Sequence, residues 1–169
     1  MTTIQLTTKI NAPIEIIFDL SRNIDVHQQS TARSHETAID GVTSGLINLN
    51  ETVTWRGKHF GVYFTHKSLI SGMENPTYFV DEMLEGKFKS FKHQHTFIQK
   101  KGFVMMEDKI QYETPYGIFG KIFDHFLLKK HLTKFISERN LFIKELAENH
   151  QKKPPKYRNT FYPKRSVMA

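Results

Sequence analysis

The stretch Ile10-Asn11-Ala12-Pro13-Ile14-Glu15-Ile16-Ile17-Phe18-Asp19-Leu20 joins two kinds of predicted secondary structure. It closes a strand-like run at about 3–10 and opens a short amphipathic helix at about 13–21. Asn11 is a favourable N-cap residue, and Pro13 lies near the first turn, where its missing N–H leaves no helical hydrogen bond unmade. Three of the apolar residues fall on one helical face. The stretch therefore predicts a strand that runs straight into a helix with one buried side.

Further along the chain, the pattern predicts one more short helix and then a series of strands. The helix is expected over 23–31. Apolar and polar residues then alternate between turn residues, which predicts strands at about 35–40, 51–57, 60–70, 77–84, 87–99 and 103–114. The residues Gly57-Lys58-His59 are the expected hairpin turn between the second and third of these strands. Strands at hairpin spacing indicate an antiparallel meander.

A long helix is expected over 118–149, where the apolar period becomes helical. At about 1.5 Å per residue it would be roughly 45 Å long. An apolar stripe near its start is expected to be core: Phe119, Ile122 and Phe126. Four polar residues in its middle are expected on the outer face: His125, Lys129, Lys130 and His131.

The first strand and the pattern Ala-Pro-x-Glu-x-Ile-Phe-Asp over 12–19 resemble the start of START/Bet v 1-like (SRPBCC) proteins. The block over 79–97 resembles the bacterial polyketide cyclase/dehydrase-like members of that superfamily. The resemblance covers about 2–149. It implies an α+β helix-grip fold, in which a curved antiparallel sheet of about six to seven strands wraps around a long C-terminal helix. Two short helices follow the first strand, and a cavity lies between sheet and long helix, with Phe119, Ile122 and Phe126 in one of its walls.

Composition and charge indicate one domain over 1–149 followed by a basic tail. A chain of 169 residues most simply forms a single domain. The net charge is +7, and six Lys or Arg lie in 150–169, where there is no Asp or Glu. This proline-containing tail is expected to be flexible, and its contact with nucleic acid or an anionic membrane stays open as a third class of function.

The N-terminal sequence has no pattern of a signal peptide, and no apolar run is long enough to span a membrane, so a cytoplasmic location is expected. The chain contains no cysteine, which excludes disulfides, thiolate nucleophiles and cysteine zinc sites.

Polar residues interrupt the apolar faces of three predicted strands. His93 and His95, two residues apart, point to the same face as Phe91 and Phe97. Asp108 lies in a similar apolar row of the last strand, and Asp81 lies between Phe79 and Met83. If these strands are neighbours, Asp81, His93, His95 and Asp108 converge.

Several roles stay open for these four residues. They can pair with one another as a structural group, or bind the polar end of a ligand. Two histidines with one or two carboxylates are also a possible set of metal ligands, although nothing in the spacing enforces it. Acid–base catalysis is the fourth role, with His93, His95, Asp81 and Asp108 as the candidate residues.

The favoured function is binding of a small hydrophobic or aromatic molecule in the cavity, without cofactor or metal. The alternative is a cyclase or dehydratase that acts on a polyketide-like substrate through a histidine and an aspartate. In either case the residues expected to line the cavity are Glu51, Trp55, Phe64, His66, Phe79, Asp81, Phe91, His93, His95, Phe97, Met106, Asp108, Ile122 and Phe126.

Overall fold

The computed structural model of the protein describes residues 1–152 and has the predicted helix-grip architecture. Its elements are β1 (Thr2–Ile10), α1 (Ile14–Ser21), α2 (Ile24–Ser30), the 3-10 turn η1 (Ala32–Ser34), β2 (Thr37–Gly41), β3 (Thr52–His59), β4 (Val62–Glu74), β5 (Tyr78–Glu85), β6 (Ser90–Lys100), β7 (Phe103–Glu113), α3 (Gly117–Phe123), the π-helical stretch η2 (Asp124–Leu128) and α4 (Lys129–Lys152). Among these helices, none has the length and apolar character that crossing a membrane requires. The predicted tail over 150–169 begins inside α4, and its part beyond Lys152 lies outside the described residues.

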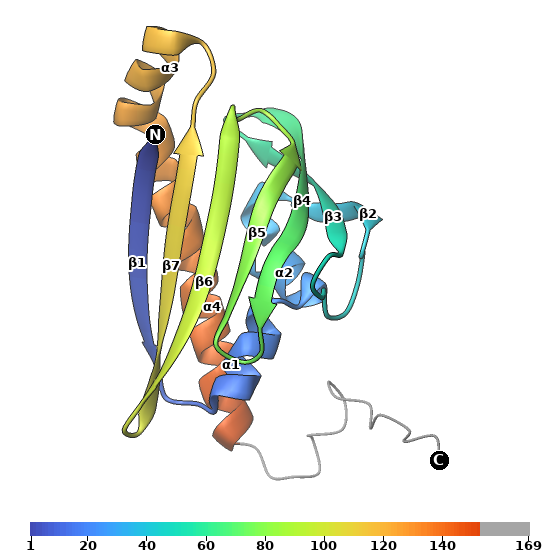
Figure 1. The fold of residues 1–169 in the computed structure, drawn as a ribbon, viewed down its shortest axis with the longest axis vertical. Coiled ribbons are helices and arrows are strands. Elements are labelled where there is room, and N and C mark those ends of the chain that lie inside the picture. The colour runs from blue at the N-terminus through green and yellow to red at the C-terminus, as the bar shows by residue number, and fades with distance from the viewer. Residues whose placement is uncertain (153–169) are drawn as a thin grey trace.

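One antiparallel sheet contains the seven strands of the described chain, in the order β1-β7-β6-β5-β4-β3-β2. Strands β2 to β7 form the predicted meander, and β1 pairs with β7. Figure 1 shows α4 running along one face of the curved sheet, behind β7 and β6, with α1 and α2 near the same face. The helices therefore enclose one face of the sheet, and side chains from both layers meet there.

The corner between β1 and α1 differs from the prediction in one respect. Asn11 is not the N-cap, because α1 begins after Pro13 and no side chain caps it. Asn11 instead donates two hydrogen bonds to Oε1 of Glu148, from its backbone nitrogen (2.9 Å) and from Nδ2 (3.2 Å). These bonds tie the corner to the far end of α4.

The turn between β3 and β4 lies farther along the chain than predicted. The residues Gly57-Lys58-His59 belong to β3, and the turn consists of Phe60 and Gly61. Both turn residues have positive φ angles, 51° and 82°, as tight hairpins require. Gly57 is buried, and an added Cβ there would lie 2.6 Å from Cγ of Glu36. Gly57 therefore permits close packing in a strand.

The apolar core has two parts on the helix-covered face. The larger part joins α1, α2 and the C-terminal half of α4 to the sheet, and the smaller part joins β1, β7 and the first half of α4. On β7, Met106 belongs to the larger part and Ile110 to the smaller part. Asp108 stands between them on the same face and is only 2% exposed. A charged residue therefore lies where the two parts of the core meet.

The predicted long helix is present, but its first third is not core. Phe119 is 78% exposed, Ile122 50% and Phe126 69%, so the prediction that they form a cavity wall is wrong. Figure 1 shows the reason, since α3 extends beyond the end of β1 and has no strand to cover it there. His131 was expected on the outer face but is half-buried, with Nε2 3.0 Å from Nδ1 of His59. His125, Lys129 and Lys130 are exposed as expected.

Candidate functional site

Strand register brings together the four polar residues singled out in the sequence. Strands β5, β6 and β7 are neighbours in the sheet. Asp81 is the register partner of His93, and His95 is the register partner of Asp108. All four side chains point to the helix-covered face, because the two histidines are two residues apart and lie opposite the two aspartates. The convergence that the sequence left conditional is present.

Asp108 is the centre of this cluster. Its Oδ1 lies 2.8 Å from Nε2 of His93 and 2.9 Å from Nδ1 of His95, although the angle at His95 is poor for a full hydrogen bond. Its Oδ2 accepts a 2.6 Å hydrogen bond from Nδ2 of Asn140 on α4. The two imidazole rings lie 3.8 Å apart. One buried carboxylate thus holds both histidines and the long helix.

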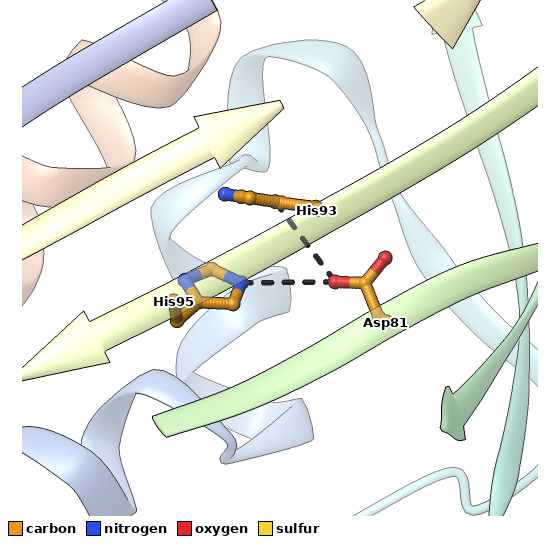
Figure 2. Close-up of side chains that lie close together, drawn as sticks. All are labelled: Asp81, His93 and His95. Atoms are coloured by element: carbon orange, nitrogen blue, oxygen red, sulfur yellow. Dashed lines mark ion pairs between the residues drawn. The ribbon is translucent and has the colours of Figure 1, made fainter. Parts of the chain in front are cut away.

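Asp81 lies on the opposite side of the two histidines. Figure 2 shows its Oδ2 facing both rings, at 3.9 Å from Nδ1 of His93 and 3.6 Å from Nε2 of His95. Both distances exceed those of hydrogen bonds. Asp81 is half-buried, whereas His93, His95 and Asp108 are buried. The space between Asp81 and the rings is therefore the accessible side of the cluster.

Electrostatics keep the carboxylates ionised. Burial opposes ionisation of Asp108, but contacts with His93 and His95 outweigh it and hold its pKa well below the ordinary value. Burial likewise opposes ionisation of Asp81, but the same two histidines lower its pKa. Burial and the neighbouring His95 lower the pKa of His93, despite its contact with Asp108. The cluster therefore contains two ionised carboxylates and, at neutral pH, a neutral His93.

Arg139 is a member of the site that the sequence pattern did not reveal. It lies on α4, is buried, and donates from Nη2 to the carbonyl oxygen of Ser21 at 2.7 Å. Its Nη1 is buried and has no hydrogen-bond partner among the described residues. The signal that would have found Arg139 is helical spacing, because it lies three residues after Ile136 and four before Ile143, both buried.

A small pocket adjoins the cluster. Its volume is about 60 Å³, and its lining residues are Ser21, Arg22, Asn23, Ile24, His27, Ile47, Val53, Trp55, Ser68, Ile70, Phe79, Asp81, His95 and Arg139. Small-molecule pockets usually measure about 300–1,000 Å³. This pocket is therefore much smaller than the cavity that the fold resemblance led us to expect. The pocket has room for a polar group or a few water molecules.

A larger hollow of about 280 Å³ lies elsewhere, lined by His35, Thr37, Arg56 and Tyr63, and it includes none of the cluster residues.

The other residues predicted for the cavity fall into three groups. Trp55 and Phe79 line the pocket, and the ring of Phe79 stacks on His95 with centroids 4.2 Å apart. The next group lies outside the pocket lining. Phe97 and Met106 are in the core, Phe91 packs against it, His66 contacts the Phe91 ring, and Phe64 is half-buried. The last group lies away from the site, because Glu51 accepts a 2.7 Å hydrogen bond from the backbone of Asn48 in a loop, and Ile122 and Phe126 are exposed.

A second polar group, centred on Glu36, was not predicted. Its Oε2 lies 2.7 Å from Nε2 of His27, and its Oε1 lies 3.2 Å from Nε2 of His59. Burial opposes ionisation of Glu36, but hydrogen bonds with His27 and His59 outweigh it and lower its pKa to about 2. The His27 ring stacks on Trp55 with centroids 4.1 Å apart. The group therefore supports the pocket wall that Trp55 forms.

Comparison with known proteins gives likeness of fold alone. No protein-family model and no curated protein matches the sequence. The protein TTHA0849 from Thermus thermophilus matches with a TM-score of 0.70 at 14% identity, over 88% of this chain and 99% of that chain. A START superfamily protein from Mycobacterium smegmatis matches with a TM-score of 0.67 at 9% identity, over 88% and 98%. Ginseng major latex-like protein 151 from Panax ginseng matches with a TM-score of 0.65 at 14% identity, over 86% and 97%.

Proposed function

We propose that this chain, which has the START/Bet v 1-like helix-grip fold, binds a small hydrophobic or aromatic molecule between its sheet and α4. The polar end of that molecule lies against Arg139, Asp81 and His95, and its apolar part lies against Trp55. The observation that carries the proposal is Nη1 of Arg139, which is buried, belongs to a residue that lines the pocket and has no hydrogen-bond partner within residues 1–152.

An unpaired N–H group inside a protein costs about 1–3 kcal/mol, and more when the group is charged. An acceptor oxygen on a bound ligand removes that cost. Without ligand, a water molecule in the same place does so, and the ligand then displaces it. Asp81 lines the same pocket and offers an acceptor for a hydroxyl or amine. A few polar groups set in apolar walls are the usual design of a small-molecule site.

The size of the pocket limits how the ligand lies. A volume of about 60 Å³ holds the polar end only, so the apolar part needs space that side chains now fill. Trp55 is half-buried, and its stacking partner His27 is on the short helix α2. We expect this pair to separate when ligand binds, because it closes the pocket on the α2 side.

Fluorescence of Trp55 tests the proposal, since it is the one tryptophan of the chain. The probe is 1-anilinonaphthalene-8-sulfonate (ANS), an aromatic anion whose sulfonate can pair with Arg139. We expect saturable one-to-one energy transfer from Trp55 to ANS, at least tenfold weaker in Arg139→Met. The matched control is Arg56→Met, an exposed arginine beside Trp55.

Ser68→Leu covers the case in which Arg139→Met does not fold, because Ser68 lines the pocket and leucine would fill it. Equal ANS binding by the wild type and a folded Arg139→Met or Ser68→Leu variant would refute the proposal. Circular dichroism and a cooperative unfolding transition establish that each variant is native, since ANS also binds loosely packed states.

Acid–base catalysis is the second candidate, favoured by the position of His95. It lines the pocket and has Asp108 2.9 Å behind its other ring nitrogen. A histidine held by a carboxylate suits proton transfer to a ligand. Turnover of a polyketone probe that is lost in His95→Gln, while ANS binding is kept, would support a cyclase or dehydratase.

A nucleic-acid or membrane role for the tail concerns residues mostly outside those described, and it stays a prediction that truncation after Lys152 would test.

A further inference from the structure

Two ring nitrogens of the cluster face Asp81. Asp108 lies against Nε2 of His93 and Nδ1 of His95, so each ring has its other nitrogen turned away from Asp108. These other nitrogens, Nδ1 of His93 and Nε2 of His95, both face Oδ2 of Asp81. Three atoms that can each bind a metal ion thus meet on one side of the cluster.

We propose that Asp81, His93 and His95 bind a divalent transition-metal ion, and that Zn²⁺ is the ion that fits best. Their three ligand atoms lie within 4.8 Å of one another. Zinc is held about 2.0–2.2 Å from nitrogen and oxygen ligands, so tetrahedral ligand atoms lie roughly 3.3–3.6 Å apart. The two distances to Asp81 are 3.9 Å and 3.6 Å, and all three atoms lie within 4.8 Å of one another, so they would move inward to hold the ion. Two imidazoles and one carboxylate are donors that zinc accepts.

Asp108 and Asn140 form the support that such a site needs. Metal-binding histidines commonly donate their second ring nitrogen to a carboxylate, which fixes the ring and its tautomer. Asp108 is hydrogen-bonded to Nε2 of His93 in this way and lies 2.9 Å from Nδ1 of His95 at a poorer angle, and Asn140 fixes Asp108 with a 2.6 Å hydrogen bond. Two carboxyl groups, Asp81 and Asp108, lie within 4 Å of the two imidazoles. A divalent cation beside them would compensate negative charge.

The proposed ion has an open side toward the pocket. Asp81 and His95 both line the pocket, and three protein ligands leave a fourth position for water or a polar group. This metal site goes beyond the proposed ligand binding and does not require it.

Zinc binding by the full-length protein tests the inference directly. The protein is dialysed against EDTA, freed of the chelator and titrated with ZnCl₂ in a calorimeter. We expect one ion per chain with submicromolar affinity, weakened on the order of 100-fold in Asp81→Asn and in His95→Gln. Asp108→Asn, at a positioning residue, should weaken binding about 10–100-fold. The matched control is His131→Gln, because His59 and His131 are a second close pair of imidazoles.

A spectrum of the unmutated protein keeps the test valid if a variant does not fold. Co²⁺ in place of zinc should give the intense visible absorption of a four- or five-coordinate site. No stoichiometric zinc binding, or binding that His131→Gln abolishes and Asp81→Asn leaves intact, would overturn the proposal. ANS titration with and without EDTA separates the two proposals, because loss of the metal site alone leaves ANS binding to the EDTA-treated protein in place.

An independent feature is the exposed apolar surface at the start of the long helix, named here the α3 surface. Seven large apolar or aromatic residues are 40–83% exposed there: Tyr116, Ile118, Phe119, Ile122, Phe123, Phe126 and Leu127. Phe60 from the β3–β4 turn packs its ring 5.4 Å from Phe123 and is itself 50% exposed. Contiguous patches of this kind mark interaction sites.

The exposed charges between Thr114 and Lys134 are of one sign. The basic residues of this stretch are Lys121, Lys129, Lys130 and Lys134, and each is exposed. Its acidic residue, Asp124, is buried and accepts hydrogen bonds from Thr2 and Tyr112. The stretch therefore presents aromatic and aliphatic side chains beside four exposed lysines, of which Lys134 also pairs with Glu138 at 4.0 Å.

We propose that the α3 surface docks on an anionic lipid bilayer. Amphipathic helical segments with bulky apolar side chains and lysines lie in the membrane interface, and each lysine near an anionic surface adds an attraction that salt weakens. The positive charge beside the patch complements acidic lipid headgroups. It would repel the same charge on a second copy of the chain.

Flotation with vesicles tests this docking. We expect the full-length protein to float with phosphatidylglycerol-containing vesicles and much less with pure phosphatidylcholine. Phe119→Glu and Phe126→Glu should each reduce the bound fraction severalfold while the basic tail is intact. The matched control is Leu141→Glu, an apolar residue on α4 that is 56% exposed. Unchanged flotation of both phenylalanine variants would refute the proposal, and so would a dimer in solution that Phe126→Glu dissociates.

Discussion

Asn140 donates a 2.6 Å hydrogen bond from Nδ2 to Oδ2 of Asp108, and this bond joins α4 to β7 inside the apolar core. Both side chains are about 2% exposed. Because the bond is short and its acceptor is ionised, it belongs to the stronger class of hydrogen bonds. It fixes both the rotation of α4 and the orientation of the carboxylate that supports His93 and His95.

Removal of the Asn140 amide should therefore destabilise the protein. Asn140→Ala leaves one oxygen of a buried carboxylate unpaired, and we expect a loss of about 2–4 kcal/mol in the free energy of unfolding. Urea denaturation at pH 7 measures it. Leu141→Ala, at the exposed neighbouring position, should change the free energy by less than about 0.5 kcal/mol. Equal effects of the two substitutions would contradict the structural role of the bond.

Acid should destabilise the fold through Glu36. Its pKa falls from 4.5 to about 2, because hydrogen bonds with His27 and His59 outweigh burial. A carboxyl group with a lowered folded-state pKa stabilises the protein above its unfolded pKa. That contribution is lost as the pH falls from about 5 toward 2. Glu36→Gln should be less stable than the wild type at pH 7, by up to about 3 kcal/mol, and the difference should shrink below pH 4.

The measurement for Glu36 is the urea midpoint at several pH values between 7 and 3. Glu145→Gln is the matched control, since Glu145 is exposed. A constant gap between wild type and Glu36→Gln across this range would disagree with the lowered pKa.

Tyr112 should stabilise the protein through its hydroxyl group. The hydroxyl donates to Oδ1 of Asp124, and burial together with Asp124 raises the pKa of Tyr112. The raised pKa means that this contribution is complete below the unfolded pKa near 10 and is lost only at higher pH. Tyr112→Phe should cost about 1–3 kcal/mol at pH 7, because Asp124 keeps only its bond from Thr2.

The exposed residue Tyr116 provides the control for Tyr112, and Tyr116→Phe should leave the thermal midpoint unchanged. In an alkaline absorbance titration, wild-type protein should show a late tyrosine signal that Tyr112→Phe lacks. If every tyrosine of the native protein ionises together near pH 10, the hydrogen bond with Asp124 is wrong.

Gly120 should not tolerate a methyl group. An added Cβ would collide with the carbonyl oxygen of Pro115, where α3 turns against the end of β7. Helix propensity alone would make Gly120→Ala stabilising by about 1 kcal/mol. We expect instead a destabilisation of about 2 kcal/mol, so the sign of the change distinguishes the two effects. At Gly72, where the nearest atom to an added Cβ is 3.7 Å away, alanine should be accepted more readily.

The period of apolar residues along the chain predicted which residues share a face of a strand and the order of strands and helices. Alternation placed His93 and His95 on one face and Asp81 and Asp108 in apolar rows, and the meander then brought them together through register. The order of elements predicted the helix grip for the same reason, because strand and helix periods differ clearly along the chain.

The sequence was less informative where tertiary packing determines whether a side chain is buried. An apolar stripe in a helix does not reveal whether another element covers it, so Phe119, Ile122 and Phe126 were assigned to the core and are exposed. A charged residue is assumed to face solvent, so Arg139 was missed although it lies on the buried stripe of α4. Pocket volume depends on how side chains such as Trp55 and His27 fill the interior, which no pattern reports.

The pairing of β1 with β7 bears on how the chain folds. Thr2 and Tyr112 are register partners although many residues separate them in the chain, so the first strand has no neighbour until the seventh has been synthesised. Contacts between such distant segments slow folding and prolong the exposure of an unpaired strand edge to other chains. Arg139 and Asn140 leave the ribosome later still. In a nascent chain that lacks α4, Asp108 and its two histidines would therefore be exposed to water and dissolved ions until α4 packs on the sheet.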